Sequence, residues 1–290
     1  MACAQGYQSR LSINGQQMTF MQYIPRTVRE LVDDGAVAIR GILDHPKERV
    51  TLGRLHIGAE IVMHPTPAEL DVLLPLMGGS ESPTDTFTIG DTYSTFDMVV
   101  DSVTKVHTYT TCKMGRAIFS GQRGAEPVQL RFLVLGTGFS EGTDFGSPTA
   151  LDTDIVYAFH EGVLTLQGGS KAFDRFQLMI DPKLQVQWNN SSTPTEICPT
   201  DRDIVLQTST PYTSSESALF TTPLSSAAGA AGSLAFTRAG QSTTFSFANL
   251  KSIAKPPPVL NKAQIRLPLT YKAYRSGSTA ALTVTHDATA

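Results

Sequence analysis

The segment Arg54-Leu-His-Ile-Gly-Ala-Glu-Ile-Val-Met63, followed by Pro65-Thr-Pro-Ala-Glu-Leu70, opens the stretch that decides the fold. Apolar residues occupy every second position from Leu55 to Met63, which predicts a β-strand with one buried face. Gly58 within it permits a bulge or the close approach of another chain segment. The stretch continues to Gly136, and we expect a helix, a hairpin and two more strands in it.

The helix is predicted from Pro67 to Met77. Thr66 is a suitable N-cap, Pro67 takes the first helical position, and Glu69 stands three residues after the cap, as in a capping box. Gly78-Gly79 ends the helix. The apolar positions of one helical face are Leu70, Leu73, Leu74 and Met77. Because the helix spans only about three turns, we expect it to pack against a sheet.

The strands that follow the helix begin with a predicted hairpin over 85–100, with its apex at Ile89-Gly90-Asp91-Thr92. Its arms would oppose Phe87 and Ile89 to Phe96 and Met98. Further strands are expected at Lys105–Lys113 and Pro127–Leu135, and the second of these alternates apolar and polar residues. Other expected strands are Met18–Tyr23, Val37–Leu43, Ile155–Leu166 and Phe173–Ile180. Thr27–Gly35 has a helix-like period, although it is short enough to be a turn.

Composition favours a β-protein. The chain has 290 residues, of which 41% are apolar and 17% charged, and no long run of helix-forming residues occurs. The net charge is −3 with scattered Lys and Arg, which argues against a sequence-reading DNA-binding protein but not against one that DNA passes without sticking. We see neither a signal peptide nor an apolar run of about 18 residues, so we expect synthesis in a cytosol-like compartment.

The order strand, helix, hairpin, strand, strand returns in the C-terminal half, at an offset of about 146 to 150 residues. The matching segments are Asp203–Ser209, the helix from Pro211, the hairpin Leu234–Asn249, Ala263–Tyr271 and Ala280–His286. Residues 139–153, rich in Gly, Ser, Thr and Asp, are predicted to form a linker. We therefore expect two tandem β-sandwich or barrel domains, 1–138 and 154–290, each with a short flanking α-helix.

Laid out in this way, the chain resembles the tail tube (major tail) proteins of long-tailed bacteriophages. The residues that carry the resemblance in the first half are Phe20, Val37–Gly41, Gly53–Met63, Pro67–Gly79, Phe87–Ile89, Tyr109–Met114 and Gln129–Gly136. In the second half they are Tyr157–Leu166 and Phe176–Asp181, and this half departs from the pattern at Pro256-Pro-Pro and in its Ala-rich segment.

The resemblance implies a virion protein without enzymatic activity, assembled in the host cytoplasm. Its domains would join neighbouring strands into a ring-wide barrel, and the rings would stack into the tail tube that conducts DNA without sequence-specific binding. Two domains in one chain imply that three copies complete a pseudo-hexameric ring, although a ring of six copies stays open. Partners would be the tape measure, terminator and baseplate proteins. The alternatives are another phage head, decoration or baseplate protein, or a carbohydrate-binding β-sandwich.

No catalytic, cofactor-binding or metal-binding residue is predicted. The sequence has no nucleophile elbow, phosphate loop or His-Glu-x-x-His motif. The histidines lack metal-ligand spacing, and Asp144, Asp152 and Asp154 match no compact calcium loop. Asp91, Asp97 and Asp101 flank turns, Gly121–Gly124 and Gly168-Gly169 are hairpin turns, and Phe87, Tyr93 and Phe96 suit cross-strand packing better than base stacking. Cys3, Cys112 and Cys198 are expected to be free thiols.

Overall fold

The computed structural model describes residues 6–33, 50–82, 84–124, 127–213, 216–225, 229–253, 256–259 and 264–288. These residues form mainly β-strands. Their helices are α1 (Pro67–Leu76), α2 (Ser217–Ser225) and the 3-10 turns η1 (Gly6–Gln8) and η4 (Phe159–Glu161). The prediction of a mainly β fold is therefore confirmed.

The strands fall into two sets. The first set, with α1, is called the first repeat and comprises β1 (Arg10–Ile13), β2 (Gln16–Met18), β3 (Gln22–Pro25), β4 (Val28–Asp33), β5 (Val50–His56), β6 (Gly58–Met63), β7 (Gly79–Glu81), β8 (Thr86–Ile89), β9 (Phe96–Asp101), β10 (Val106–Gln122), β11 (Gln129–Leu135) and β12 (Gly138–Gly142). The second set, with α2, is called the second repeat and comprises β13 (Gly162–Leu166), β14 (Gly169–Lys171), β15 (Arg175–Asp181), β16 (Leu184–Gln187), β17 (Glu196–Pro199), β18 (Asp203–Pro211), β19 (Ala230–Arg238), β20 (Gln241–Ser252), β21 (Arg266–Tyr274) and β22 (Leu282–Asp287).

The same order of antiparallel pairings occurs in both repeats. In the first repeat, β2, β1, β9 and β10 pair in succession, and the far side of β10 carries β12 and then β11, which leads to β6 and β3. In the second repeat, β14, β13, β19 and β20 pair in succession, and β20 carries β22 and then β21, which leads to β18 and β15. A separate hairpin, β4–β5 or β16–β17, stands at the corresponding place in each repeat.

These pairings change the correspondence expected from the sequence. The hairpin Leu234–Asn249 does exist, as β19 and β20, but its counterpart is the pair β9 and β10 rather than residues 85–100. Likewise β21 corresponds to β11, and β22 corresponds to β12 rather than to Pro127–Leu135. The correspondence drawn from element order is therefore wrong for these strands, because the offset between equivalent strands is not constant along the chain.

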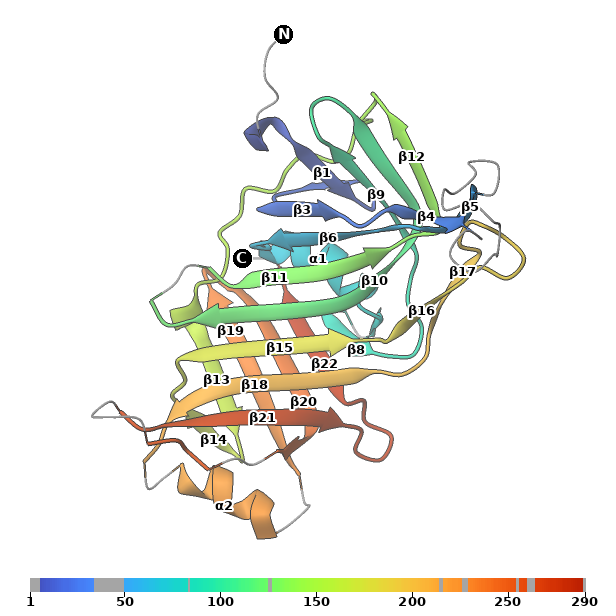
Figure 1. The fold of residues 1–290 in the computed structure, drawn as a ribbon. Helices are drawn as coiled ribbons and strands as arrows, with labels where there is room; N and C mark the ends of the chain where they lie inside the picture. Colours follow the sequence, from blue (N-terminus) through green and yellow to red (C-terminus); the bar gives the residue numbers. More distant parts are fainter. Residues whose placement is uncertain are drawn as a thin grey trace.

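Hydrogen-bonded strands join the two repeats. The end of β10 pairs with β15, from Ala117 opposite Ile180 to Gln122 opposite Arg175, and β8 pairs with β22. Consequently one continuous sheet, called the long sheet, spans both repeats, and its strands lie one below another at the front of Figure 1. Its strand order is β3, β6, β11, β10, β15, β18 and β21. Strands β13, β20 and β22 cross behind it in a second layer.

The hydrophobic core lies between these layers, and its buried residues come from both repeats. Phe119 of β10, for example, packs against Phe245 of β20 with ring centroids 5.0 Å apart. The division into domains 1–138 and 154–290 therefore stays a prediction. The proposed linker 139–153 begins within β12, and the strand pairs between the repeats bypass it.

The predicted helix and the strand before it form as expected. Thr66 caps α1, and the reciprocal bond between the Glu69 carboxylate and the Thr66 N–H completes the capping box. Gly78 ends the helix with a φ of +88°, a conformation that glycine adopts without strain. At Gly58, an added Cβ would lie 2.8 Å from the Val134 carbonyl oxygen, so the predicted close approach is present.

Two local predictions are wrong. Residues 85–100 do not form a hairpin, because β8 pairs with β7 and β22 whereas β9 pairs with β1 and β10. The helix-like segment Thr27–Gly35 contains strand β4, which pairs with β5. The strand expected over Arg54–Met63 is divided between β5 and β6, and Met18–Tyr23 between β2 and β3. Val37–Leu43 lies outside the described residues.

Candidate assembly surface

The junction between the repeats depends on the length of β10, which runs for 17 residues. Its first half pairs with β9 and β12, and its second half pairs with β11 on one side and β15 on the other. A register shift between Met114 and Ala117 lets the strand bend from one layer into the other. Beyond the last pair, the Arg123 N–H donates to the Asp174 carbonyl at 2.6 Å. Strand β10 of the first repeat thus pairs with β15, which would otherwise be an edge strand of the second repeat.

Strand β3 holds the place in the first repeat that β15 holds in the second, but it lacks an equivalent neighbour. Within the described residues, β3 pairs with β6 alone. Its side chains are correspondingly open: Ile24 is 43% exposed, and Met21, directly before the strand, is 53% exposed. An apolar strand with an unpaired flank invites pairing with another chain unless it is covered.

The long sheet ends at the opposite side with β21 and the end of β20. β20 pairs with β21 from Asn249 to Ser252, and the Ile253 N–H continues this ladder by donating to the Thr270 carbonyl at 2.8 Å. Ile253 is 59% exposed. The two borders of the long sheet therefore carry one exposed isoleucine each.

The outward face of the long sheet carries a row of uncharged polar side chains across five adjacent strands. Successive cross-strand partners in this row are Gln129, Ser120, Gln177, Gln207 and Thr270. Their chain neighbours Leu130, Phe119, Leu178, Leu206 and Leu269 point into the core and are at most 2% exposed. The row lies in an open groove of about 660 Å³. Among the residues that line this groove, the ionisable ones are His64 and Arg175.

Several other cations on this face are paired with carboxylates. Glu60 is only 4% exposed and binds both Arg26 of the β3 end and Arg131 of β11. Burial by itself would raise the pKa of Glu60, but the hydrogen bonds from Arg131 and Arg26 outweigh it and hold the pKa below its usual range. Glu60 alternates with the core residues Ala59 and Ile61, so it lies on the face away from the core, where the two arginines cover it.

Asp203 of β18 has a similar position between two lysines. Its carboxylate contacts Lys272 of β21 and lies 3.0 Å from the Lys183 ammonium. The hydrogen bonds from Lys272 and Lys183 lower the pKa of Asp203. These lysines are thus less available to an outside anion such as a phosphate group.

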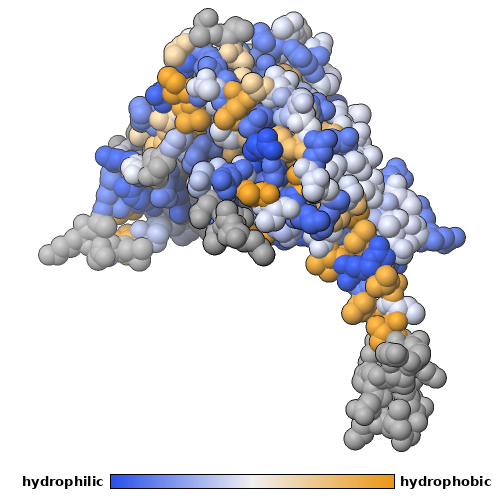
Figure 2. All heavy atoms as spheres, turned by 90° about the horizontal axis from the view of Figure 1, so that it is seen from above, coloured by the Kyte–Doolittle hydropathy of each residue, from blue (hydrophilic) through white to orange (hydrophobic). Residues whose placement is uncertain are grey.

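A narrow arm formed by β4 and β5 extends away from the body and is edged with apolar residues (Figure 2). The exposed apolar side chains of this arm are Val28, Leu31, Val32, Val50 and Leu52. The base of the arm is fixed to the second repeat, because the Trp188 Nε1–H donates to the Leu55 carbonyl at 3.0 Å. Trp188 therefore anchors a contact between the repeats.

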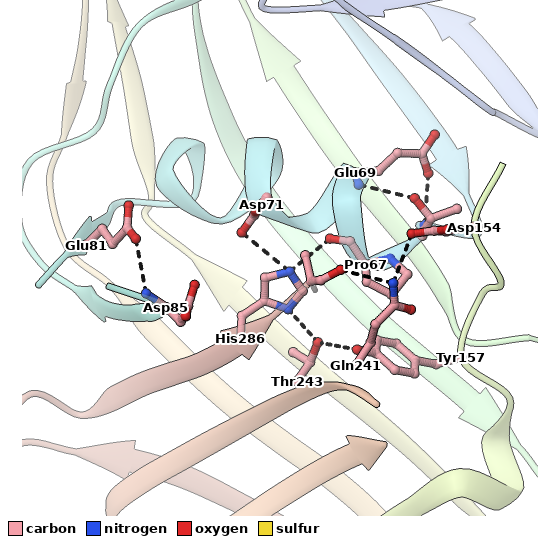
Figure 3. Close-up of polar contacts among 12 residues, drawn as sticks. Pro67, Glu69, Asp71, Glu81, Asp85, Asp154, Tyr157, Gln241, Thr243 and His286 are labelled. Atoms are coloured by element: carbon pink, nitrogen blue, oxygen red, sulfur yellow. Dashed lines mark hydrogen bonds and ion pairs between the residues drawn. The ribbon is translucent and has the colours of Figure 1, made fainter. Parts of the chain in front are cut away.

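A buried polar cluster ties α1 to the second repeat (Figure 3). His286 of β22 is fully buried, with Nε2 2.9 Å from the Pro67 carbonyl oxygen and Nδ1 2.8 Å from the Thr243 hydroxyl. Since a carbonyl oxygen only accepts, Nε2 carries a proton. Asp71 lies 3.5 Å from Nε2. Burial raises the pKa of Asp71, the charge of His286 opposes this, and the nearby Asp85 adds to it.

This cluster does not fit a catalytic triad. His286 and Thr243 are 0% and 1% exposed, so a substrate has no access to either side chain. The hydrogen bonds of the cluster also run from one protein group to the next. His286 bridges the Pro67 carbonyl and the Thr243 hydroxyl, and Thr243 Oγ1 donates to the Tyr157 hydroxyl at 3.1 Å. The cluster holds α1 and the second layer together.

The remaining candidate residues have separate structural roles. Among the described residues, no group of three or more His, Cys, Asp or Glu side chains is placed to hold a metal ion. Asp144 accepts from the Gly146 N–H, Asp152 from the Thr66 hydroxyl and Asp154 from Gln241, so they do not converge on one point.

The other histidines are dispersed as well. His56 binds Glu30 at 2.7 Å, His64 lies 3.2 Å from the Val128 carbonyl and His107 binds the Tyr23 hydroxyl at 2.9 Å. His160 lies in η4, and His45 is outside the described residues. These three histidines therefore contact protein groups in separate places and do not converge on one point.

The acidic and aromatic candidates of the first repeat are also accounted for. Asp91 lies 3.5 Å from Arg202, Asp97 accepts from the Thr111 N–H and Asp101 pairs with Arg10. The aromatic side chains Phe87, Tyr93 and Phe96 are at most 6% exposed, so they pack inside the protein instead of presenting rings to bases.

The predicted turns and free thiols complete the set. Gly168 lies in the turn between β13 and β14 with a φ of +77°, and Gly124 follows β10 with a φ of +76°. Cys112 is a buried free thiol, and Cys198 is a partly exposed one. Burial raises the pKa of Cys112 to about 12. Cys3 lies outside the described residues.

Sequence reasoning missed the two border isoleucines and the polar row. Alternation marks Ile24 and Gln177 as positions on one strand face or the other. It does not tell which strand lies beside them, and that information decides their role.

Comparison with known proteins adds no relative, because no protein-family model and no curated protein sequence matches the chain. In the part of the chain that is described, none of the helices has the length and apolar character needed to span a membrane.

Proposed function

We propose that the protein is a self-assembling structural subunit, the tail tube protein of a long-tailed bacteriophage. The observation that carries the proposal is the pairing of β10 with β15, which joins two repeats of the same strand order into one sheet. Copies of the chain joined in the same way would extend the long sheet head to tail, and repeated head-to-tail contacts close into a ring or wind into a helix.

The dimensions of such a ring suit a conduit. Each copy would contribute the seven strands of the long sheet and the end of β20, so three copies would place about 24 strands side by side. At roughly 4.8 Å per strand, the circumference of this barrel is about 115 Å and its diameter is about 37 Å. Strand tilt widens this further. After side chains line the wall, the opening still suits the passage of a DNA double helix.

The chemistry of the outward face agrees with this role. Neutralising phosphates with Lys and Arg is the main source of non-specific DNA affinity, so a wall that conducts DNA needs few free cations. The row from Gln129 to Thr270 offers amides and hydroxyls, and Glu60 and Asp203 hold four cations in ion pairs. The apolar arm β4–β5 supplies additional surface for contact between copies.

The proposal includes a place in the virion, assembly in the host cytoplasm, and tape measure, terminator and baseplate proteins as partners. It assigns no catalytic activity. Another phage structural role would share the self-association but give no stacked tube. The carbohydrate-binding alternative gains little support, because the one aromatic residue among those lining the groove, Phe176, is 2% exposed and offers no platform for sugar stacking.

Native mass spectrometry and negative-stain electron microscopy of the purified chain test the proposal. We expect closed assemblies in multiples of three copies, and hollow filaments as the protein concentration rises. A ring of six copies would keep the tube but remove the pseudo-hexameric arrangement. A chain that stays monomeric up to millimolar concentration at physiological salt would refute the proposal.

A further inference from the structure

The internal junction indicates which residues meet when two copies pair. In that junction, Ile118 of β10 lies opposite Met179 of β15, and Ile118 also lies opposite Arg131 of β11. Both apolar side chains point to the outward face and are half-buried. The junction thus covers one apolar side chain of each repeat with one from the other.

The residue that corresponds to Met179 in the first repeat is Ile24. Met179 pairs with Val205, and Val205 pairs with Lys272, two residues before the end of β21. In the first repeat, Leu133 stands two residues before the end of β11 and leads through Glu60 to Ile24. Ile24 therefore holds the place of Met179, but on a flank that has no strand beside it in the described residues.

The residue that corresponds to Ile118 in the second repeat is Ile253. Arg131 precedes Leu133 by two residues, and Thr270 precedes Lys272 by two residues. Ile118 lies opposite Arg131, and Ile253 lies opposite Thr270 through the bond from its N–H. Among the described residues of a single copy, no residue takes the place of Met179 beside this isoleucine.

From this correspondence we infer that Ile253 of one copy lies opposite Ile24 of the next copy, in an antiparallel strand junction that repeats the internal contact of Ile118 with Met179. The occupant of the β3 flank is thus a second copy of this chain. Ile24 and Ile253 are 43% and 59% exposed in one copy, and the junction covers both at once. The inference rests on the proposed function, but it fixes a register that ring formation alone does not.

Disulfide trapping tests this register. The variant carries Ile24→Cys and Ile253→Cys together with Cys3→Ser and Cys198→Ser, while the fully buried Cys112 stays. After mild oxidation of the assembled protein, a denaturing gel without reductant is expected to show a ladder of linked chains that ends at the copy number of the ring. Reduction should return every band to the monomer.

The matched control pairs Ile24→Cys with Val163→Cys in the same background. Val163 is 51% exposed but lies on β13, which has neighbours on both sides, so no ladder is expected. Rings that give no ladder, or give the same ladder in the control, would overturn the register and leave the proposed function standing. Failure of the unmodified chain to form any ring would instead remove the proposed function.

A charge pair keeps the inference testable if the cysteine variant does not assemble. Ile24→Lys alone and Ile253→Glu alone are each expected to lower the assembled fraction at least tenfold, whereas the two together in one chain restore it, because each new lysine then meets a glutamate of the next copy. Val163→Lys should leave assembly unchanged. Single variants that assemble normally, or a double variant that fails to recover, would contradict the assigned register.

Discussion

Replacement of Glu69 by alanine is expected to lower the free energy of unfolding by about 3 to 5 kcal/mol. Glu69 is fully buried, and its carboxylate accepts the Thr66 N–H at 2.9 Å and the Thr19 N–H at 2.7 Å. Alanine would leave the buried Thr66 N–H without a partner, at about 1 to 3 kcal/mol, and would remove the bond from the N–H of the more exposed Thr19, at about 1 kcal/mol. Loss of the reciprocal cap of α1 adds to this cost.

Glutamine at position 69 separates the packing from the charge. Burial raises the pKa of Glu69, bonds from Thr66 and Thr19 oppose this, and the nearby Asp152 adds to the rise. Because the folded state then holds the proton to a higher pH than the unfolded chain, its contribution to stability is present below about pH 4.5 and is lost as the pH rises through the folded-state pKa. Glu69→Gln should remove this pH dependence.

Urea unfolding between pH 4 and 7, followed by the fluorescence of Trp188, measures both effects. Glu81→Ala is the control, since Glu81 is exposed and accepts a hydrogen bond from the Asp85 N–H at the surface; its replacement should change stability by less than about 0.5 kcal/mol. If Glu69→Ala behaves like Glu81→Ala, or Glu69→Gln keeps the slope of the parent protein, the account of this carboxylate is wrong.

Two further changes test the sheet and the helix end. Arg131→Met removes one of the two arginines that bind Glu60 and should cost about 1.5 to 3 kcal/mol at pH 7. Since the pKa of Glu60 is held low, the parent's extra stability is present above about pH 4.5 and decreases as the pH falls through the folded-state pKa, so urea unfolding should show a smaller difference between the two proteins at pH 3 than at pH 7. Gly78→Ala should cost at least 1 kcal/mol more than Gly146→Ala in thermal unfolding, because both residues have a left-handed φ but only at Gly78 would a Cβ lie 2.8 Å from the Tyr93 ring. Equal losses for the two glycines would refute this explanation.

The sequence by itself determined the local structure where one short segment contains all the interacting groups. The cap of α1 needs only Thr66, Pro67 and Glu69, and all three lie within four residues. The alternation in β11 and β15 likewise marks their buried residues, because a strand turns every second side chain to the same face.

Only the tertiary structure decided which strands are neighbours. Phe87 and Met98 have the pattern of a hairpin, yet β8 joins a strand near the C-terminus and β9 joins β1, because alternation specifies a buried face and not the partner that covers it. For the same reason, Ile24 and Ile253 look like ordinary strand residues in the sequence. Their significance comes from the borders of the long sheet, which have no further strand beside them in the described part of the chain and which leave apolar side chains open on opposite sides.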